Sequence, residues 1–145
     1  MQIEQLKAIT SDRLAVIDVD ATLQVAALAL TNPGIGLAIV SDRSGRAMGV
    51  LSKSDLIRHL AQTEPADAPV TTLMSRDIVY CHGHDEVHAV WEIMVERGLQ
   101  NMPVLNAEAE PLGILAIGDA MKLLFEQEKL EEHMLADYVA GIGYR

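Results

Sequence analysis

Two short stretches of the sequence contain the residues best suited to chemistry. In "GILAIGD" (Gly113–Asp119) and "GVLSKSD" (Gly49–Asp55), an aspartate follows a glycine by six positions. A buried carboxylate needs a partner, and one carboxylate can accept a hydrogen bond from each of two adjacent hydroxyls, such as those of a ribose. Ser52 and Lys53 could meet phosphate oxygens beside the free amides of a helix N-terminus. Alternatively, each aspartate caps the helix that follows, and the residues alone favour capping.

The segment "CHGHDEVH" (81–88) gathers side chains that could bind a metal. His84 and His88 are four residues apart, which places two imidazoles on one face of a helix that includes both. We expect Asp85 to cap this helix and to leave His84 outside it, so that these residues and His82 are exposed histidines of a strand–helix connection. No metal site is therefore predicted. The sequence has no P-loop, nucleophile elbow or dinucleotide-binding glycine motif, and no enzyme activity is predicted.

Both aspartate stretches belong to an internal repeat. Residues 14–60 align without gaps with residues 78–124 at a constant offset of 64, and apolar positions fall opposite apolar positions nearly throughout. Such a repeat predicts two copies of one structural unit. The identical positions are Gly34/Gly98, Val40/Val104, Gly49/Gly113, Leu51/Leu115, Asp55/Asp119 and Leu60/Leu124.

Each copy has the pattern strand, helix, strand, turn, strand, helix. The first copy is predicted to contain strands at 13–19, 36–40 and 47–52, and helices at 21–32 and 53–60. The second is predicted to contain strands at 77–81, 102–106 and 111–116, and helices at 85–98 and 118–125, the first of which ends at Gly98.

The expected division of the chain follows from these elements. Residues 1–62 form the first repeat with an N-terminal segment, 63–70 a linker with no periodicity, and 71–125 the second repeat. Residues 126–145 form a charged helix and tail, which packs on its own domain or forms a dimer. The apolar residues expected to make its contacts are Leu130, Met134, Leu135 and Tyr138.

The composition limits the class of protein. The chain of 145 residues is 50% hydrophobic, carries a formal net charge of −10 and contains one cysteine. The negative charge argues against a nucleic-acid partner, because proteins that bind the phosphate backbone carry a basic surface. No signal peptide or membrane-spanning run is evident, and one cysteine excludes an internal disulfide framework. We expect a cytoplasmic protein with no membrane partner.

Two copies of this pattern, each ending in or near G-x-x-[ST]-x-x-D, resemble a tandem pair of CBS domains, a Bateman module. "LMSRDIV" before the second copy and "MPVLN" within it also match, and "HMLADYVAGIG" resembles the tail of small stand-alone bacterial CBS-pair proteins. The resemblance implies an α/β (α+β) fold, in which two pseudo-twofold-related β-α-β-β-α repeats pack through their sheets. It also implies a flat homodimer.

The resemblance further implies a regulatory module that binds an adenine-containing ligand in clefts shared between the repeats. The implied ligand is AMP, ADP, ATP or S-adenosylmethionine, bound as a ligand and not as a cofactor, and an effector protein would read the bound state. The backbone of Ala15 or Val79 would contact the base edge. The first cleft would contain Asp55, Ser52, Lys53, Val79, Gln100, Asn101 and Met102. The second would contain Asp119, Thr10, Ala15, Gly36, Leu37 and Ala38.

The sequence departs from the family pattern at two places. Ala116 stands where the hydroxyl residue belongs, and Gln100 and Asn101 stand where relatives often have an Arg-His pair. We therefore expect weak or selective binding, with the Asp55 cleft as the one that takes a charged nucleotide. Two alternatives remain: a structural dimerisation module with non-functional clefts, and a metal-responsive module that uses His82, His84 and His88.

Overall fold

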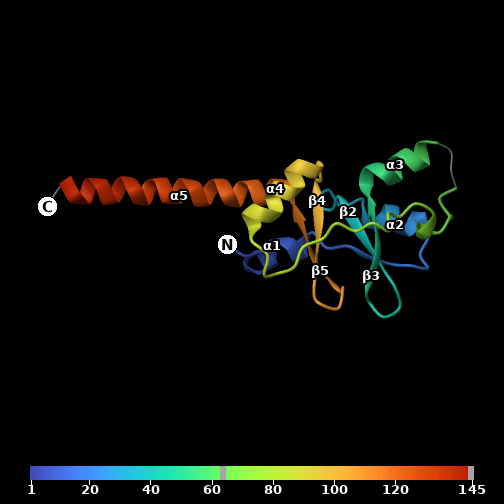
Figure 1. The fold of residues 1–145 in the computed structure, drawn as a ribbon. Coiled ribbons are helices and arrows are strands. Elements are labelled where there is room, and N and C mark those ends of the chain that lie inside the picture. The colour runs from blue at the N-terminus through green and yellow to red at the C-terminus, as the bar shows by residue number, and fades with distance from the viewer. Residues whose placement is uncertain (63–64, 144–145) are drawn as a thin grey trace.

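The computed structural model describes residues 1–62 and 65–143, with side chains up to Glu132. Strands lie at the centre of the molecule, helices cover them on both sides, and the last helix extends far beyond the rest (Figure 1). The mixed α/β architecture confirms the predicted fold class. The elements in chain order are η1 (Ile3–Leu6), α1 (Lys7–Asp12), β1 (Val16–Asp18), α2 (Leu23–Ala29), β2 (Leu37–Ser41), β3 (Ala47–Ser52), α3 (Lys53–Ala61), η2 (Val70–Thr72), α4 (Val87–Arg97), β4 (Asn101–Leu105), β5 (Pro111–Ala116) and α5 (Ile117–Gly143).

The two repeats contain the same hairpin in the same register. In the antiparallel pair β2–β3, Val40 lies opposite Gly49, and the register shifts directly after Val40. In β4–β5, Val104 lies opposite Gly113, and the register shifts at the same place. Every pairing of the second hairpin is that of the first moved by 64 positions, which confirms the predicted repeat.

The repeats pack on each other through their sheets. One buried cluster joins Leu37 and Ile39 of β2 to Leu105 of β4 and Ile114 of β5. Two further clusters fill the space between each sheet and its own helices. Burial of these aliphatic side chains is the main force that holds the repeats together.

Each core is completed by the segment that precedes the other repeat. Ile3 and Leu6 are buried in the core of the second repeat, and the backbone of Ile3 donates to the carbonyl of Asp85 (N···O 2.9 Å). Val70 and Met74 are buried in the core of the first repeat. The chain therefore crosses between the repeats twice, which brings the segment around Arg13 to the second repeat.

The strand predicted at 77–81 is reduced to one bridge, in which Cys81 pairs in parallel with Val104. The cause is Pro103. In the first repeat the corresponding Ile39 donates its N–H to the carbonyl of Ala15 (2.9 Å), but proline has no N–H to donate.

Three helix boundaries differ from the prediction. α2 ends at Ala29 instead of 32, because Thr31 and Asn32 hydrogen-bond to nearby backbone and close a turn. Asp85 is not the cap of α4: its carboxylate accepts the N–H of His82 (2.8 Å), and Glu86 is the N-cap residue. The helices predicted on either side of residue 126 are one helix, α5, because no proline interrupts it. The prediction that Gly98 ends α4 is confirmed by its left-handed backbone (φ 67°).

The side chains of Met134, Leu135 and Tyr138 lie outside the described residues, and Leu130 is exposed. Over the described part of the chain, no helix combines the length and the apolar character needed to cross a bilayer.

Candidate ligand-binding clefts

A pocket of about 460 Å³ lies between the repeats. It is lined on one side by Ser52 and Lys53, where β3 passes into α3, and on the other by Gln100 and Asn101, where β4 begins. The resemblance to CBS domains assigned these four residues to the first cleft, and the structure brings them together. Asp55, Val79 and Met102, which were assigned to the same cleft, are not among the residues that line this pocket. Gly36 and Leu37, which were expected in the second cleft, line this pocket too, because Leu37 pairs directly with Ser52 in the β2–β3 ladder.

Ser52, and not Asp55, is the N-cap of α3. The hydroxyl of Ser52 accepts the backbone N–H of Asp55 (3.1 Å). The capping interpretation of Asp55 is therefore wrong. The Asp55 side chain is 47% exposed, and its carboxylate accepts one hydrogen bond from Arg58 on the next turn (3.3 Å). Such an exposed pair one turn apart is weak, so this carboxylate stays accessible to other donors.

Two other polar side chains of the pocket contact neighbouring backbone. The ammonium of Lys53 donates to the carbonyl of Asn32 (3.2 Å). The amide of Asn101 packs against Gly36, where a Cβ would lie 2.9 Å from its Nδ2 atom. Gly36 therefore permits the two repeats to approach at this point. Met102 and Ala38, also predicted as ligand contacts, have side chains buried in the cores and can offer only backbone.

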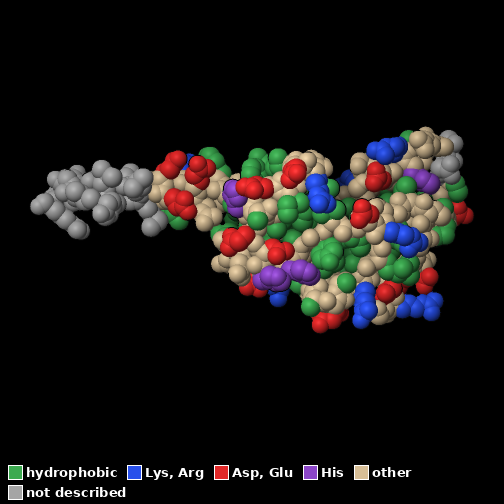
Figure 2. Space-filling view, viewed as in Figure 1, with side chains coloured by type: hydrophobic (Ala, Val, Ile, Leu, Met, Phe, Trp, Pro, Cys, Tyr) green, Lys and Arg blue, Asp and Glu red, His purple; other side chains and the backbone are tan. Residues whose placement is uncertain are grey.

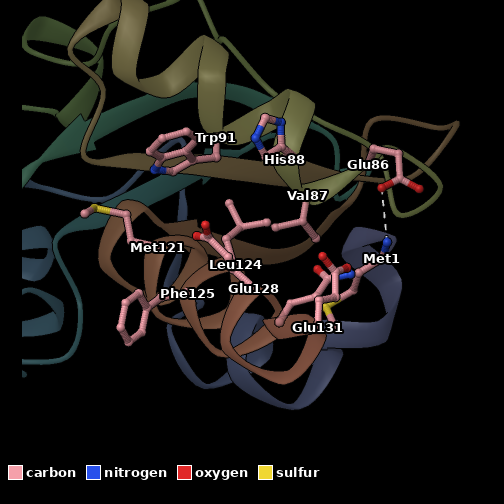
Figure 3. A pocket seen from close by; sticks show the side chains of 11 residues that line it. Met1, Glu86, Val87, His88, Trp91, Met121, Leu124, Phe125, Glu128 and Glu131 are labelled. Carbon is pink, nitrogen blue, oxygen red and sulfur yellow. Dashed lines mark hydrogen bonds and ion pairs between the residues drawn. The ribbon is translucent and has the colours of Figure 1, made fainter. Parts of the chain in front are cut away.

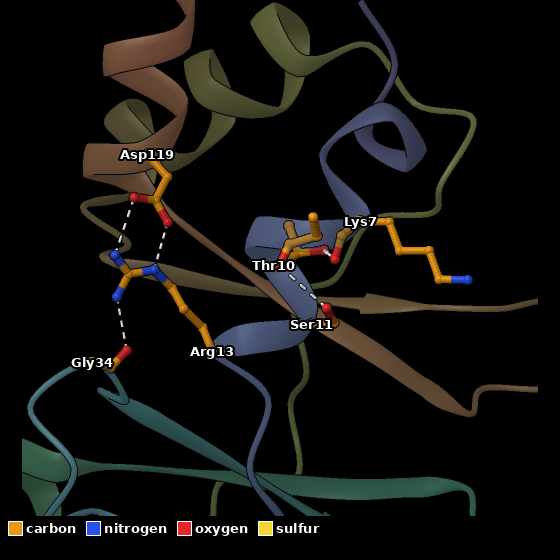
Figure 4. Close-up of polar contacts among 7 residues, drawn as sticks. Lys7, Thr10, Ser11, Arg13, Gly34 and Asp119 are labelled. Atoms are coloured by element: carbon orange, nitrogen blue, oxygen red, sulfur yellow. Dashed lines mark hydrogen bonds and ion pairs between the residues drawn. The ribbon is translucent and has the colours of Figure 1, made fainter.

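Asp119 has a partner inside the protein. The guanidinium of Arg13 donates to both carboxylate oxygens, from Nε to Oδ2 (2.5 Å) and from Nη2 to Oδ1 (3.1 Å). Its Nη1 donates to the carbonyl of Gly34 (2.7 Å), as Figure 4 shows. Arg13 therefore links the second repeat to the first, and it occupies the carboxylate that was predicted to hold a ribose. The hydrogen bond to Asp119 raises the pKa of Arg13, so the guanidinium stays charged.

Sequence reasoning did not predict Arg13 as part of this site. The residue lies 106 positions from Asp119, and no local pattern connects them. The repeat does carry one signal: the position of Arg13 in the first copy is occupied by Asp77 in the second. A carboxylate cannot replace the arginine as a partner for Asp55, so the repeat itself indicates that the two clefts differ.

Thr10 packs where α1 crosses β5. A Cβ on Gly113 would lie 2.7 Å from the hydroxyl oxygen of Thr10, and Thr10 is only 4% exposed. Its hydroxyl donates to the carbonyl of Lys7 (3.5 Å). In this structure Thr10 therefore contributes to packing between α1 and the second repeat. On the other repeat, Gly49 admits Met74 in the same way.

The backbone groups predicted to contact a base differ between the clefts. The carbonyl of Ala15 accepts the N–H of Ile39. The corresponding carbonyl of Val79 has no hydrogen-bond donor among the described residues, because Pro103 lacks the N–H. Val79 therefore keeps an acceptor that an exocyclic amine could use, whereas that of Ala15 is already engaged.

The histidine segment is engaged in other contacts. His82 Nδ1 lies 2.8 Å from the carbonyl oxygen of Leu105, and His88 Nδ1 lies 3.0 Å from Glu92. Within the described residues, no three histidine, cysteine or acidic side chains converge as metal ligands. Burial raises the pKa of the Cys81 thiol to about 12.

Comparison with known proteins identifies the family. The CBS domain model matches residues 6–62 and again residues 70–126. The chain belongs to the CBS domain family. Both matched segments contain one hairpin and one of the aspartates, so the tandem arrangement predicted from the repeat is confirmed.

Several CBS domain structures resemble this one. A CBS domain protein from Pyrobaculum aerophilum, solved in complex with AMP, is 25% identical with a TM-score of 0.72, over 82% of this chain and 89% of that chain. The CBS domain pair of protein MJ0100, solved with 5′-methylthioadenosine and S-adenosylmethionine, is 20% identical with a TM-score of 0.73, over 88% of this chain and 98% of that chain. The latter similarity shows the fold.

Relatives by sequence are more varied. An uncharacterised 17.7 kDa protein of Acidianus ambivalens is 23% identical over 96% of this chain and 84% of its own length. The transcriptional repressor CcpN of Bacillus subtilis is 32% identical over 50% of this chain and 35% of the repressor. The match thus covers 84% of the Acidianus protein but only 35% of the repressor.

Proposed function

We propose that this protein is a non-catalytic regulatory module that binds an adenine-containing ligand in the cleft around Asp55 and Ser52. The observation that carries the proposal is the open pocket of about 460 Å³ between the repeats, lined by Ser52, Lys53, Gln100 and Asn101. It offers a hydroxyl, an ammonium and two amides at the N-terminus of α3, where the helix dipole favours an anion. AMP in the similar protein of Pyrobaculum aerophilum supports this ligand class.

The proposed pose uses the two features that distinguish this cleft. Asp55 accepts hydrogen bonds from the ribose hydroxyls, and the free carbonyl of Val79 accepts one from the exocyclic amine of adenine. The pseudo-twofold relation supports this arrangement: Arg13 lies beside Asp119, and we therefore expect the equivalent segment, with Asp77 and Val79, beside Asp55. The phosphate lies toward Ser52 and Lys53. An effector protein reads the resulting change in the repeats.

The Asp119 cleft is proposed to have a structural role. Its carboxylate is held by Arg13, and the carbonyl of Ala15, expected to contact the base, already accepts the N–H of Ile39. Ala116 stands at the position where the family pattern has a hydroxyl residue. This favours one working ligand site in each chain. A homodimer of the chain, as the resemblance implies, is compatible with that arrangement.

Calorimetric titration of the full chain with AMP, ADP, ATP and S-adenosylmethionine tests the proposal. Asp55→Ala should weaken binding at least tenfold, because charged hydrogen bonds contribute about 1.5–3 kcal/mol each and tenfold is about 1.4 kcal/mol. The matched control is Asp20→Ala, which removes an acid that is 66% exposed and that, among the described residues, pairs with Arg43 alone. Unchanged affinity in Asp55→Ala refutes the cleft assignment.

Thermal unfolding separates the proposed function from the structural alternative. A ligand at 100 times its Kd stabilises the folded chain by about 2.7 kcal/mol, or roughly 5–10 °C for a protein of this size. Absence of any shift with all four compounds at millimolar concentration would mean that the clefts are non-functional. The module would then serve dimerisation alone.

A further inference from the structure

The loop between α2 and β2 forms part of the wall of the proposed ligand pocket. Gly36 lines the pocket, and its carbonyl accepts the backbone N–H of Lys53 (N···O 2.9 Å). The ammonium of Lys53 donates to the carbonyl of Asn32 (3.2 Å), near the start of the same loop. Lys53 therefore holds residues 32–36 at both ends, with its backbone at one end and its side chain at the other.

Arg13 ties the middle of this loop to the second repeat. Its Nη1 donates to the carbonyl of Gly34 (2.7 Å), while Nε and Nη2 donate to the two carboxylate oxygens of Asp119 (Figure 4). The N–H of Gly34 in turn donates to the side-chain oxygen of Asn32 (2.9 Å). The loop residues that Lys53 and Arg13 hold are therefore hydrogen-bonded to each other.

The repeat shows which of these contacts belong to the first copy alone. The backbone bond between Lys53 and the loop has an equivalent 64 positions later, where Ile117 donates to the carbonyl of Gln100 (2.9 Å). The side-chain bonds cannot recur there, because Ile117 has no ammonium and Asp77 stands at the position of Arg13. The side-chain contacts are therefore an addition to the repeat and not a requirement of its fold.

Lys53 provides the positive charge of the pocket. It is the one lysine or arginine among the described residues that line it. A larger hollow of about 610 Å³ lies between α4 and α5 (Figure 3), and its described lining contains Glu86, Glu128 and Glu131 but no lysine or arginine. Figure 2 likewise shows acidic side chains concentrated on the α5 half of the molecule, whereas lysine and arginine lie mainly on the other half. A phosphate therefore finds its cation in the pocket at Lys53.

On the basis of the proposed function, we propose that Arg13 is a positioning residue for the ligand, although it is not among the residues that line the pocket. An ammonium has three N–H donors, and Lys53 gives one of them to Asn32, so the others can reach a phosphate. While Arg13 holds the loop, Lys53 is already in the geometry that the phosphate needs. Without Arg13, ordering the loop and Lys53 costs part of the binding free energy. Asp119, which the resemblance assigned to the second cleft, thereby supports the first.

Calorimetric titration of the full chain with AMP and with adenosine tests this role, because only AMP has a phosphate for Lys53. Arg13→Ala should weaken AMP binding about fivefold or more and adenosine binding less than about twofold. A merely structural role would weaken both ligands equally. On a Lys53→Met background, the further change Arg13→Ala should alter AMP affinity less than about twofold, because the two residues act through one contact.

Two further variants complete the titration. The matched control is Arg43→Ala, which makes the same change in net charge at an arginine that is 87% exposed, and it should leave both affinities unchanged. Asp119→Asn weakens the hold on Arg13 while it preserves the shape of the side chain, and it should show the same selective loss for AMP, of about twofold or more. Circular dichroism at the titration temperature checks that each variant is folded.

A second measurement needs no nucleotide. An amine-reactive ester labels the Lys53 ammonium at a rate that reports how firmly Asn32 holds it, and the exposed Lys129 is the internal reference. Arg13→Ala should raise the labelling rate of Lys53 relative to Lys129 about threefold, as followed by mass spectrometry. An unchanged rate, or equal losses of AMP and adenosine affinity, overturns the positioning role. Absence of binding of both compounds to the wild-type chain would refute the proposed function instead, and a raised labelling rate would still support the link from Arg13 to Lys53.

Discussion

The pair of Arg13 and Asp119 allows a quantitative test of how the repeats are held together. Arg13→Ala removes two hydrogen bonds to a carboxylate and one to the carbonyl of Gly34. The side chains in the pair are 33% and 20% exposed. Exposed pairs contribute about 0.2–1 kcal/mol, and loss of one partner from a fully buried pair costs about 3–5 kcal/mol. The intermediate burial gives an expected loss of about 2 kcal/mol in the free energy of unfolding.

Urea denaturation measures this loss, and thermal unfolding should show it as a decrease of roughly 4–8 °C in Tm. The control is Arg43→Ala, since Arg43 and Asp20 form a pair at 3.4 Å with 87% and 66% exposure. That variant should lose less than about 0.5 kcal/mol. Arg13→Ala combined with Asp119→Asn completes a double-mutant cycle, with an expected coupling energy of about 1–2 kcal/mol. A cost no larger than that of the control, or a coupling near zero, refutes the view that Arg13 links the repeats.

Further predictions concern packing and the buried thiol. Gly113→Ala should lower the free energy of unfolding, measured by urea denaturation, by about 1–3 kcal/mol, because the new Cβ would lie 2.7 Å from Thr10. The control is Gly118→Ala, whose Cβ meets nothing within 4 Å, and it should be neutral or slightly stabilising. Equal losses in the two variants would contradict the close approach of α1 to Gly113. Cys81 should react with a thiol reagent at pH 8 only after unfolding, since it is 3% exposed. Its pKa is raised from 9.0 to about 12, so its contribution to stability is complete below pH 9 and declines as the pH rises toward 12. Wild-type protein should therefore lose more stability than Cys81→Ala between pH 8 and 10.5, and parallel pH profiles would argue against this.

Much of the fold could be predicted because it depends on local pattern. Alternating and continuous apolar runs with turn residues between them define both hairpins, and the offset of 64 correctly relates their registers. The strand at 77–81 was wrong because its pairing requires a donor from residue 103, which belongs to a different strand. The prediction that Asp85 caps α4 was wrong because its carboxylate accepts the N–H of His82 instead.

The candidate cleft was predictable only where neighbouring residues build it. Ser52 and Lys53 adjoin in sequence, but their position beside Gln100 and Asn101 in one pocket was expected from the resemblance to CBS domains and not from a local pattern. The position of Gly36 and Leu37 in that same pocket depends on which strand lies beside Ser52. That information is in the pairing of β2 with β3 and not in the residue types.

The sequence by itself determined the repeat and the two hairpins, because each depends on hydrophobic period and turn chemistry within a few tens of residues. The residues of the two clefts were expected from the resemblance to CBS domains. Only the tertiary structure decided how the clefts differ. The chain crosses between the repeats, and Arg13 reaches Asp119 across 106 positions. Within the described part of the chain, Asp55 pairs only with the exposed Arg58 on its own helix. Contacts of that kind arise from the packing of whole elements, and a pattern within one segment carries no record of them.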